Sequence, residues 1–488
     1  MIMVIPKEIK EVIAVLEKAG FEAYLVGGCV RDLILKQTPN DWDVTTNARP
    51  PEIAKLFKRH FMDNDFGMVT IITNSLEESL KEIQVMPYRI ERDYRDQRHP
   101  GQIDFIDNLK EDLARRDFTV NAMALGIYPS GKINIIDLYD GQKDLNKHII
   151  RAVGDPNERF KEDALRMLRA VRLSTTLDFE IEPKTLNAIQ DNSKLLQNIS
   201  SERVREELIK IISNVRAAEG IELLRRVGLL TYIIPELENS YDVEQNKHHI
   251  YSVYEHSIRS LRYAAEENFN LHVRLAALLH DIGKPETKSG QGEEATFYNH
   301  EVVGANIVNK LMRRLKFPML DIKKVVKLVR YHLFYYNVDE VGESSVRKLI
   351  RQVEPENMAD LIHVRMADRI GSGVPKAKPY KLRHLEYIID RLARDPISAD
   401  MLAVDGHDII NLLAIQPGPK IGQILTILLE QVLEDPKRNK KDYLLDQIRE
   451  LGKISNEGLT EMARRSKNEI EKVREEADLS IREKFHVK

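Results

Sequence analysis

Two aspartates are the residues with the clearest chemical potential in this chain. Asp41 and Asp43 flank Trp42 at the start of an expected strand. Side chains on a strand alternate between its two faces, so these carboxylates should point the same way. Paired carboxylates bind divalent cations such as Mg2+, which can in turn hold a nucleoside triphosphate. An Asp-x-Asp pair alone is more often a solvated surface feature, so it needs support from its surroundings.

A glycine turn just before the aspartates supplies that support. The apolar run from Tyr24 to Val26 leads into Gly27-Gly28, and a helix is expected to follow. Such a turn leaves backbone N–H groups exposed at the start of a helix, where a phosphate can bind. Together, the turn and the two aspartates predict a site for a metal-bound triphosphate.

A second group of potential metal ligands lies in the middle of the chain. It combines a His-Asp pair in the sequence HDIGKP with an earlier helical histidine and a later aspartate. These residues are His256, His280, Asp281 and Asp368. Imidazole and carboxylate groups are typical ligands of a hydrolytic transition metal with open positions for water. His300 and His332 are candidates for a second metal, with an ordinary packing role as the alternative.

The elements that must position these residues are of two kinds. Residues 1–140 mix helical and strand patterns, as in a small α/β domain, whereas the chain past Asp137 is helical almost throughout. The fold class is therefore α+β. Tyr88 to Pro100 has little apolar periodicity and much charge, which predicts a mobile basic loop. Further helices are expected at 162–173, 201–228, 252–268, 271–281, 301–315, 320–332, 345–352 and 356–370, and from 381 to the C-terminus, with a charged helix pair from about 456.

Composition narrows the class of protein. A chain of 488 residues should form two to four domains, and 42% hydrophobic with 31% charged residues is typical of a soluble protein. The sequence contains no apolar run of membrane-spanning length and no signal-peptide pattern. The single Cys29 fits a reducing compartment, so a cytoplasmic protein with no membrane partner is expected.

The charge balance restricts how nucleic acid could bind. Because 74 Lys and Arg are offset by 77 Asp and Glu, the net charge of −3 gives no overall attraction for RNA. RNA binding would depend on local basic faces of the protein. Basic residues on such a face can equally well be ordinary solvent-exposed charges with no role in binding. The candidates are Arg203, Arg205, Lys210, Arg225 and Arg226.

Several motifs in combination resemble one known family. LVGGCVRD, DWD, RRDFTVNAMA, DLYDG, EDALRMLRAVRL and the stretch 401–425 are similar to the class II nucleotidyltransferases, which include bacterial CCA-adding enzymes and poly(A) polymerases. The resemblance covers about residues 20–235 and 380–450. It implies a catalytic head (1–140) and a helical nucleotide-recognition and RNA-binding body (141–238). After the middle region that contains HDIGKP, it implies a helical tRNA-binding tail (379–488).

The same resemblance implies roles for matching residues. Asp41 and Asp43 would hold two Mg2+ ions, Gly28 and Arg31 would contact the triphosphate, and Arg116 would contact nucleotide or primer. The nucleotide-recognition helix would carry Asp163, Arg166, Arg169 and Arg172. One position departs from the family pattern, because Gln84 stands where a third acidic residue is usual; Asp104 is a weaker substitute.

Base choice can be argued from residue types. On one helix, Arg166 would lie about 60° around the axis from Asp163, with Arg172 on the opposite side. Asp163 can accept from an exocyclic amino group while Arg166 donates to the neighbouring ring nitrogen. Cytosine and adenine match this pattern, whereas uracil and guanine would leave both protein groups unpaired. The alternative is an ordinary surface ion pair.

The middle region resembles a second family. HDIGKP with a preceding helical histidine and a distant aspartate is similar to the HD-superfamily phosphohydrolases, which implies an HD domain over 239–378. The implied ligands are His256, His280, Asp281 and Asp368, holding Ni, Mn, Co or Fe. The implied activity is that of a phosphatase or 2′,3′-cyclic phosphodiesterase, a purely structural domain is the alternative, and a homodimer is a candidate assembly.

The predicted function is CCA addition to the tRNA 3′ end from CTP and ATP, with release of pyrophosphate. Three alternatives remain at this point. The chain could be an A-adding enzyme that works with a separate CC-adding partner, a poly(A) polymerase, or an HD signalling phosphohydrolase whose N-terminal module only binds nucleotide or RNA. Under the resemblance, the basic loop at 88–100 argues against a CC-only enzyme.

Overall fold

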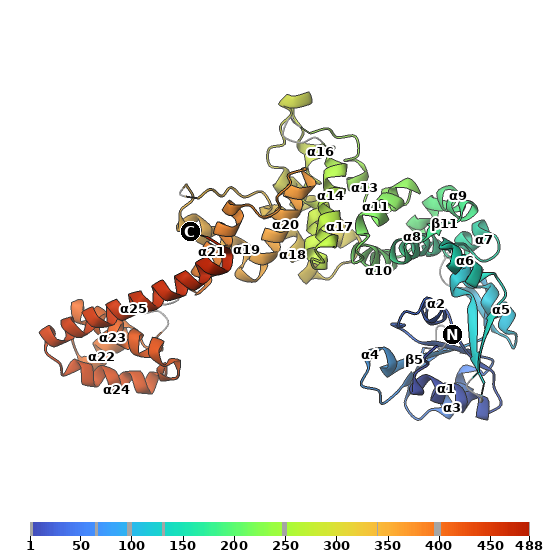
Figure 1. The fold of residues 1–488 in the computed structure, drawn as a ribbon, viewed down its shortest axis with the longest axis horizontal. Helices are drawn as coiled ribbons and strands as arrows, with labels where there is room; N and C mark the ends of the chain where they lie inside the picture. The colour runs from blue at the N-terminus through green and yellow to red at the C-terminus, as the bar shows by residue number, and fades with distance from the viewer. Residues whose placement is uncertain are drawn as a thin grey trace. The chain divides into compact units, whose positions relative to one another are not determined.

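The computed structural model describes residues 3–63, 67–94, 100–128, 132–245, 251–338, 340–394 and 402–487 (Figure 1). The chain forms two compact units. The first comprises Met1–Arg330 with Ala367–Gly373, and the second comprises Tyr331–Met366 with Val374–Lys488. The sequence-based boundaries after 140 and 238 fall within the first unit and that after 378 within the second, so the four-domain division stays a prediction.

The first unit begins with a seven-stranded sheet in the order β3-β4-β5-β2-β1-β8-β9. Its strands are β1 (Ala23–Val26), β2 (Asp43–Thr46), β3 (His60–Asp63), β4 (Met68–Ile72), β5 (Glu82–Pro87), β8 (Met123–Ile127) and β9 (Ile133–Asp137). Within this sheet, β2 and β5 pair in parallel and the other neighbouring strands pair antiparallel. The predicted α/β character of this part is confirmed.

Short helices accompany this sheet. They are α1 (Lys7–Lys18), α2 (Gly28–Ile34), α3 (Pro50–Leu56), α4 (Glu78–Lys81) and α5 (Leu109–Ala114). On α1, Ile9, Val12, Ile13 and Leu16 recur at helical spacing and are all buried, as the periodicity predicts. The core of the sheet includes fully buried Leu25, Val44, Val85 and Leu125. The strand, glycine turn and helix predicted around Gly27 are therefore present as β1 and α2.

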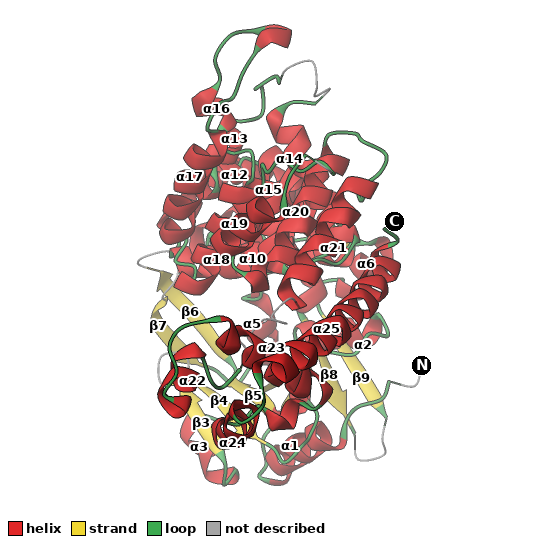
Figure 2. Ribbon diagram, turned by 90° about the vertical axis from the view of Figure 1, so that its left-hand side faces the viewer, coloured by secondary structure: helices red, strands yellow, loops and turns green. Residues whose placement is uncertain are grey.

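A two-stranded ribbon replaces the predicted basic loop. β6 (Arg89–Tyr94) and β7 (Pro100–Phe105) pair antiparallel in a separate sheet, shown in yellow in Figure 2. Residues 95–99 of the predicted loop lie outside the described part of the chain. For the described residues the prediction is wrong, because ladder hydrogen bonds between two strands satisfy the backbone without any apolar periodicity. Tyr88 continues the pairing at the base of the ribbon, donating from its N–H to the Thr46 carbonyl and accepting from Ile106.

The rest of the first unit is almost entirely helical. Two two-residue strands, β10 (Ile149–Ile150) and β11 (Glu180–Ile181), pair in parallel. The larger helices are α6 (Gly141–Lys147), α7 (Pro156–Glu162), α8 (Leu165–Leu177), α9 (Pro183–Asn192), α10 (Ser201–Ile212), α11 (Ala217–Arg226), α14 (Val253–Glu266), α15 (Leu271–Leu279), α17 (His300–Arg314), α18 (Met319–Tyr331) and the end of α20 (Met358–Gly371). The helix expected over 201–228 is divided into α10 and α11 by a turn at 213–216.

The second unit contains further helices. They are α19 (Glu343–Val353), α21 (Tyr380–Arg394), α22 (Gly406–Leu413), α23 (Pro419–Glu434), α24 (Lys441–Gly452) and α25 (Asn456–Phe485). The C-terminal stretch is one continuous 30-residue helix rather than the predicted pair, because buried Leu459 and Ile470 pack in the core formed with α23 and α24. Among the described residues, no helix has both the length and the apolar character needed to cross a membrane.

Candidate functional sites

Asp43 opens β2, and its neighbour across the sheet is Gln84. The parallel register of β2 and β5 places these two residues side by side. Residues paired on adjacent strands point to the same face, so the Gln84 amide lies where a third carboxylate is usual in the resembling family. Asp41 is exposed two residues before the strand. Asp104 lies in β7 and thus in the separate ribbon, not on a strand beside Asp43.

Gly27 allows Asp43 and Arg116 to approach each other. Its φ of +78° lies in the left-handed region, which side chains other than glycine rarely adopt. A Cβ atom at this position would lie 3.3 Å from Nη1 of Arg116 and 3.4 Å from Oδ2 of Asp43. The turn therefore makes room for a cation and a carboxylate.

The electrostatics of Asp43 suit a metal ligand. Burial raises the pKa of its carboxyl to about 6; Arg116 opposes this shift and Asp41 adds to it. Among the described residues, the Asp43 carboxylate has no ion-pair partner. This partly buried carboxylate forms no ion pair in the described part of the chain and has Gln84 as its cross-strand neighbour, which fits the oxygen ligands that Mg2+ prefers.

Arg31 and Arg169 are the two ends of a polar chain. Arg31 donates from Nε to Asp32 at 2.8 Å and from Nη1 to Oδ1 of Asn121 at 2.9 Å. Asn121 in turn donates to Asp117, whose other oxygen accepts from Nε of Arg169 at 2.8 Å. Two arginines predicted to contact different parts of a nucleotide are thus held by one network. Asp117 and Asn121 were not singled out from sequence, although both lie in the RRDFTVNAMA motif.

Buried Asp117 forms an ion pair with Arg169, whose side chain is 35% exposed; Nη2 of the arginine lies 2.6 Å from Oδ2 of Asp117. Burial alone would raise the pKa of Asp117, but Arg169 outweighs it and lowers the pKa to about 2. A depressed carboxyl pKa stabilises the fold above about pH 4, and this contribution is lost as the pH falls through about 2.

We expect Asp117→Asn to lower the free energy of unfolding by about 2 kcal/mol at pH 7, because the substitution removes this charge and leaves Arg169 without it. Urea unfolding of both proteins at pH 7, 5 and 3 provides the measurement. The difference should be the same at pH 7 and 5 and smaller at pH 3. A difference that grows on acidification would contradict the assigned pKa shift.

Asp163 and Arg166 lie close in sequence but bind different partners. Asp163 falls between α7 and α8 rather than inside one helix, and its Oδ1 accepts from the N–H of Leu165. The single helix predicted over 162–173 is wrong at this point, because an aspartate can bond nearby N–H groups and so favours a helix start. Arg203 holds Asp163 through both of its oxygens, at 2.7 and 3.3 Å.

Arg166 is buried and held by other groups. Its Nη1 donates to Glu162 at 2.7 Å, and its Nη2 donates to the carbonyl of Arg115 at 3.1 Å. Arg172 instead pairs with buried Glu207 at 2.6 Å, which agrees with its predicted place away from Asp163. Asp163 and Arg166, the predicted base-reading pair, therefore do not bond each other. Arg203 holds Asp163, and Glu162 and the Arg115 carbonyl hold Arg166.

Of the basic residues proposed to follow RNA phosphates, several have protein partners. Arg203 is bound to Asp163, and Arg205 donates to the Lys316 carbonyl. Arg225 pairs with Glu238 at 2.9 Å and stacks on Tyr241, with its guanidinium 3.2 Å from the ring centre. Lys210 also lies 3.5 Å from Glu207. These contacts account for the four residues without RNA, which strengthens the surface interpretation for them; Arg226 stays a candidate.

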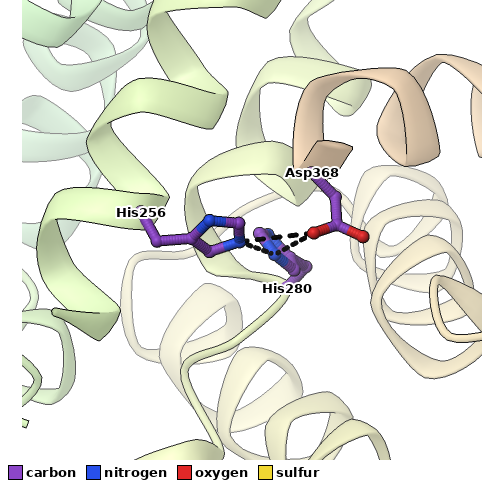
Figure 3. Close-up of side chains that lie close together, drawn as sticks. All are labelled: His256, His280 and Asp368. Atoms are coloured by element: carbon purple, nitrogen blue, oxygen red, sulfur yellow. Dashed lines mark hydrogen bonds and ion pairs between the residues drawn. The ribbon is translucent and has the colours of Figure 1, made fainter. Parts of the chain in front are cut away.

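The predicted HD-type residues converge in the first unit. His256 comes from α14, His280 directly follows α15, and Asp368 comes from the last turns of α20; their side chains point toward one another in Figure 3. The Nε2 atoms of the two histidines are 2.9 Å apart, and Oδ1 of Asp368 is 3.4 Å from that of His256. All three ligand atoms lie within 4.8 Å of one another, and the residues are buried.

Close helix packing creates this convergence. A Cβ atom on Gly371 would lie 2.1 Å from Oγ of Ser260 and 2.9 Å from the His256 carbonyl, so α20 can approach α14 only with glycine there. Nδ1 of His280 lies 2.9 Å from the Ala277 carbonyl, which leaves Nε2 to face the site. Three imidazole and carboxylate groups converging in this way can hold a divalent transition metal.

Asp281 is the centre of a second set of contacts. Its oxygens lie 3.3 Å from Nε2 of His256, of His280 and of His300, and it accepts from Lys284 at 2.6 Å. Burial alone would raise the pKa of Asp281, but His280 and Lys284 hold it well below its usual range. His300 is therefore placed at the predicted site. Lys284, missed from sequence although it belongs to HDIGKP, also donates to Gln245.

His332 follows α18 and is buried. It belongs to the second unit, whereas the other five predicted ligands belong to the first. Its participation in a second metal site stays a prediction.

Three family models match the chain in the order expected from the motifs. Residues 23–151 match the "Poly A polymerase head domain", and 178–241 match the "Probable RNA and SrmB- binding site of polymerase A". Residues 253–393 match the "HD domain". The first match contains Asp41, Asp43 and Arg116, and the third contains all of the predicted HD-type ligands.

Curated relatives extend the similarity over most of the chain. A CCA-adding enzyme of Limosilactobacillus reuteri is 32% identical over 449 residues, which cover 91% of this chain and 96% of the relative. The chain belongs to the CCA-adding enzyme family. A CCA-adding enzyme of Enterococcus faecalis is also 32% identical, over 90% of this chain and 96% of its own length. Membership of this family makes the chain a nucleotidyltransferase, and the predicted family resemblance is confirmed.

Solved structures of CCA-adding enzymes share the fold. The Bacillus stearothermophilus CCA-adding enzyme in complex with CTP matches 91% of this chain and 98% of its own, with 26% identity and a TM-score of 0.59. The Thermotoga maritima CCA-adding enzyme complexed with tRNA matches 92% and 97%, with 18% identity and a TM-score of 0.51. The second likeness concerns the fold alone. The α+β fold class predicted from the sequence is confirmed.

Proposed function

We propose that this chain completes the tRNA 3′ end by adding cytidine, cytidine and adenosine residues from CTP and ATP without a template. The observation that carries the proposal is the Asp43 carboxylate, which is partly buried, forms no ion pair with a described residue and lies beside Arg116 in the head of a CCA-adding family member. In the reaction, the 3′-hydroxyl oxygen bonds to the α-phosphorus and the bond to the β-phosphate oxygen breaks. Pyrophosphate leaves, and the hydroxyl proton passes to solvent.

Each residue of the head then has a defined task. Asp41 and Asp43, with the oxygen of Gln84 as a neutral neighbour, would hold Mg2+, which neutralises charge on the attacking and leaving oxygens when bound. The Gly28 N–H and Arg31 would hold the triphosphate. Arg31 is kept in place by Asp32 and Asn121, so its orientation does not depend on the nucleotide. Catalysis of this type rests on positioning and charge, and no protein general base is required.

Base selection would occur at the start of α8. Asp163 accepts from an exocyclic amino group and Arg166 donates to the adjacent ring nitrogen, which admits CTP and ATP and excludes UTP and GTP. Glu162 and Arg203 would orient the two groups from behind, at 2.7 Å each. Arg169, fixed by Asp117, would bind the nucleotide beside them, whereas Arg172 would act through Glu207 on the helix framework.

We expect Asp163→Ala to relax this selection. The substitution removes the acceptor for the amino group, so addition from CTP and ATP should fall by about tenfold or more while UTP improves relative to both. Addition of all four nucleotides to the same tRNA provides the measurement. Arg203→Met is the matched control, because it removes the partner of Asp163 but keeps the acceptor. If discrimination against UTP in Asp163→Ala is unchanged, Asp163 does not read the base.

The test of the whole proposal uses tRNA ends of defined length. The purified protein is incubated with tRNA that lacks all three terminal nucleotides, or only the terminal adenosine, with labelled CTP, ATP or both. A CCA-adding enzyme completes both substrates. Addition of adenosine alone, and only to the longer substrate, would identify an A-adding enzyme; a long adenosine tract would identify a poly(A) polymerase. No addition to any end would favour a nucleotide-binding module attached to an HD phosphohydrolase.

We further propose that the HD-type site is a metal-dependent phosphohydrolase acting as a phosphatase or 2′,3′-cyclic phosphodiesterase. The support is the convergence of His256, His280 and Asp368, with Asp281 and His300 alongside. A bound Ni, Mn, Co or Fe ion would supply an activated water at neutral pH. Lys284, positioned by Asp281 and Gln245, brings a positive charge to the same place. His332 as a ligand of a second ion and a homodimeric assembly are part of this proposal.

A further inference from the structure

Asp112, in α5 of the head, is a completely buried carboxylate surrounded by donors. It is 0% exposed. Its Oδ1 accepts from Nε and Nη2 of Arg115, at 3.0 and 2.7 Å. Its Oδ2 accepts from Nη2 of Arg116 at 3.2 Å and from the Thr45 hydroxyl at 3.4 Å. Three of these hydrogen bonds come from charged guanidinium groups and one comes from a neutral hydroxyl. Together they fix the orientation of Asp112 and of the arginines bound to it.

Arg116 is thereby tied at one end only. Its Nη2 is bound to Asp112, whereas its Nη1 lies 3.3 Å from the position of a Cβ atom on Gly27, with Oδ2 of Asp43 at 3.4 Å from that same point. Its Nε is buried and has no hydrogen-bond partner in the described part of the protein. The guanidinium therefore faces Asp43 across Gly27 without pairing with it.

The absence of an ion pair between Arg116 and Asp43 needs a physical explanation. An arginine and a carboxylate so close in a partly buried site would gain from a direct bidentate pair. Such a pair would occupy the oxygens of Asp43 and place a full positive charge where a cation must bind. Asp112 is the anion that competes for the guanidinium, and Thr45, two residues along β2 from Asp43, fixes Asp112 to the same strand.

We propose that Asp112 is a positioning residue that keeps Arg116 away from Asp43 and so preserves the affinity of the head for Mg2+. This inference rests on the proposed nucleotidyl transfer and adds a specific device to it. Asp112 itself touches neither nucleotide nor metal. Its effect should appear in the concentration of Mg2+ that the protein needs, rather than in the rate when Mg2+ saturates.

The experiment compares wild-type protein with Asp112→Asn, which keeps the shape of the side chain and removes its charge. Equilibrium binding of labelled CTP is measured as a function of Mg2+ concentration, and CTP addition to tRNA is measured in parallel. We expect the Mg2+ midpoint to rise by about five- to tenfold in both assays, because Arg116 is then drawn to Asp43. The rate at saturating Mg2+ should stay within about twofold of wild type.

Asp144→Asn is the matched control. Asp144 is a buried aspartate of the same unit, 1% exposed, that pairs with Arg151 at 3.0 Å and accepts from the Thr119 hydroxyl at 2.7 Å. Its substitution removes the charge of a comparably buried aspartate, whose partner Arg151 is 40% exposed, without touching Arg116. Its Mg2+ midpoint should be that of wild type. An equal shift in Asp144→Asn would mean that general loosening, not Arg116, raises the Mg2+ requirement.

Two further variants decide the mechanism. In an Arg116→Gln background, Asp112→Asn should no longer change the Mg2+ midpoint, because no cation is left to move. If Asp112→Asn does not fold, Arg115→Met tests the idea from the other side, since it removes one of the two arginines paired with Asp112 and leaves Arg116 paired with it; the midpoint should then fall or stay the same. A rise in Arg115→Met, or an unchanged midpoint in Asp112→Asn, would overturn the proposal.

Failure of this inference is distinguishable from failure of the proposed function. If wild-type protein neither binds CTP in a Mg2+-dependent way nor extends tRNA, the proposed function is wrong whatever Asp112 does. If wild-type protein does both and the variants do not differ, only the role of Asp112 is wrong.

Discussion

Replacing Asp43 with asparagine should abolish nucleotide addition, with a loss of at least about a thousandfold for both CTP and ATP. Asp43 is the carboxylate that opens β2, and its cross-strand neighbour on β5 is the uncharged Gln84, which cannot replace its charge. An asparagine retains one weakly coordinating oxygen and no charge. Addition to tRNA at saturating Mg2+ provides the measurement, and activity within about tenfold of wild type would remove Asp43 from the catalytic centre.

The same variant should be more stable than wild type in the absence of metal. Burial raises the pKa of Asp43 to about 6, so the fold disfavours its charged form. This penalty is absent below about pH 4, where the group is protonated in both states, and is fully present above about pH 6. Asp43→Asn should therefore raise the free energy of unfolding by about 1–3 kcal/mol at pH 7, and by less at pH 5.

The combination of lost activity and gained stability separates this prediction from simple misfolding. A misfolded variant would lose both activities of the chain and unfold more easily. Asp43→Asn should instead retain hydrolysis at the HD-type site, which its position in the head does not touch. Reduced stability together with lost activity would contradict the assigned environment of Asp43.

Motif spacing predicted which residues gather, and the structure shows why it could do so. Gly27, Asp41 and Asp43 lie within one short stretch of sequence, so a strand-turn-helix and a following strand suffice to place them. His280 and Asp281 are neighbours as well. In such cases local geometry carries most of the site, and resemblance to a family supplies the distant members Arg116, His256 and Asp368.

The contacts between these groups could not be derived in the same way. A periodicity argument places Asp163 and Arg166 on one helix. In the structure Asp163 precedes α8, accepts a hydrogen bond from the N–H of Leu165 at the start of that helix, and is held by Arg203, forty residues later. Likewise, the sequence shows Gln84 where a third acidic metal ligand is expected, which suggests that this ligand is missing. Only the parallel pairing of β2 with β5 shows that its side chain still occupies that place.

The β6–β7 ribbon shows a further limit of sequence patterns. Charge and the lack of apolar periodicity over Tyr88 to Pro100 are compatible with a loop, but two strands joined through backbone hydrogen bonds can have the same sequence signature. The partner strand begins at Pro100, where the charged stretch ends, and continues to Phe105. For this reason hairpins made of charged residues are easily missed, whereas the buried helices of the second half follow from their apolar stripes.

Replacing His280 with alanine should eliminate the hydrolytic activity and leave nucleotide addition within about twofold of wild type. His280 contributes an Nε2 atom that lies 2.9 Å from that of His256 and 3.8 Å from Asp368, so its loss removes one of three converging ligands. Metal content after equilibration with Ni, Mn or Co, and hydrolysis of 2′,3′-cyclic nucleotides, provide two separate measurements. Both should fall together, by at least about a hundredfold for hydrolysis.

His272→Ala is the matched control, because His272 lies in the first turn of α15, the same helix that His280 follows. It also faces a carboxylate, with Nε2 2.8 Å from Asp321, but it is 26% exposed and outside the converging group. Its substitution should leave metal content and hydrolysis unchanged. If wild-type protein binds no metal and hydrolyses neither cyclic nucleotides nor phosphate monoesters, the buried His-Asp cluster is structural. In that case His280→Ala should still destabilise the fold, because the buried Asp281 carboxylate would lose one of the groups that satisfy it.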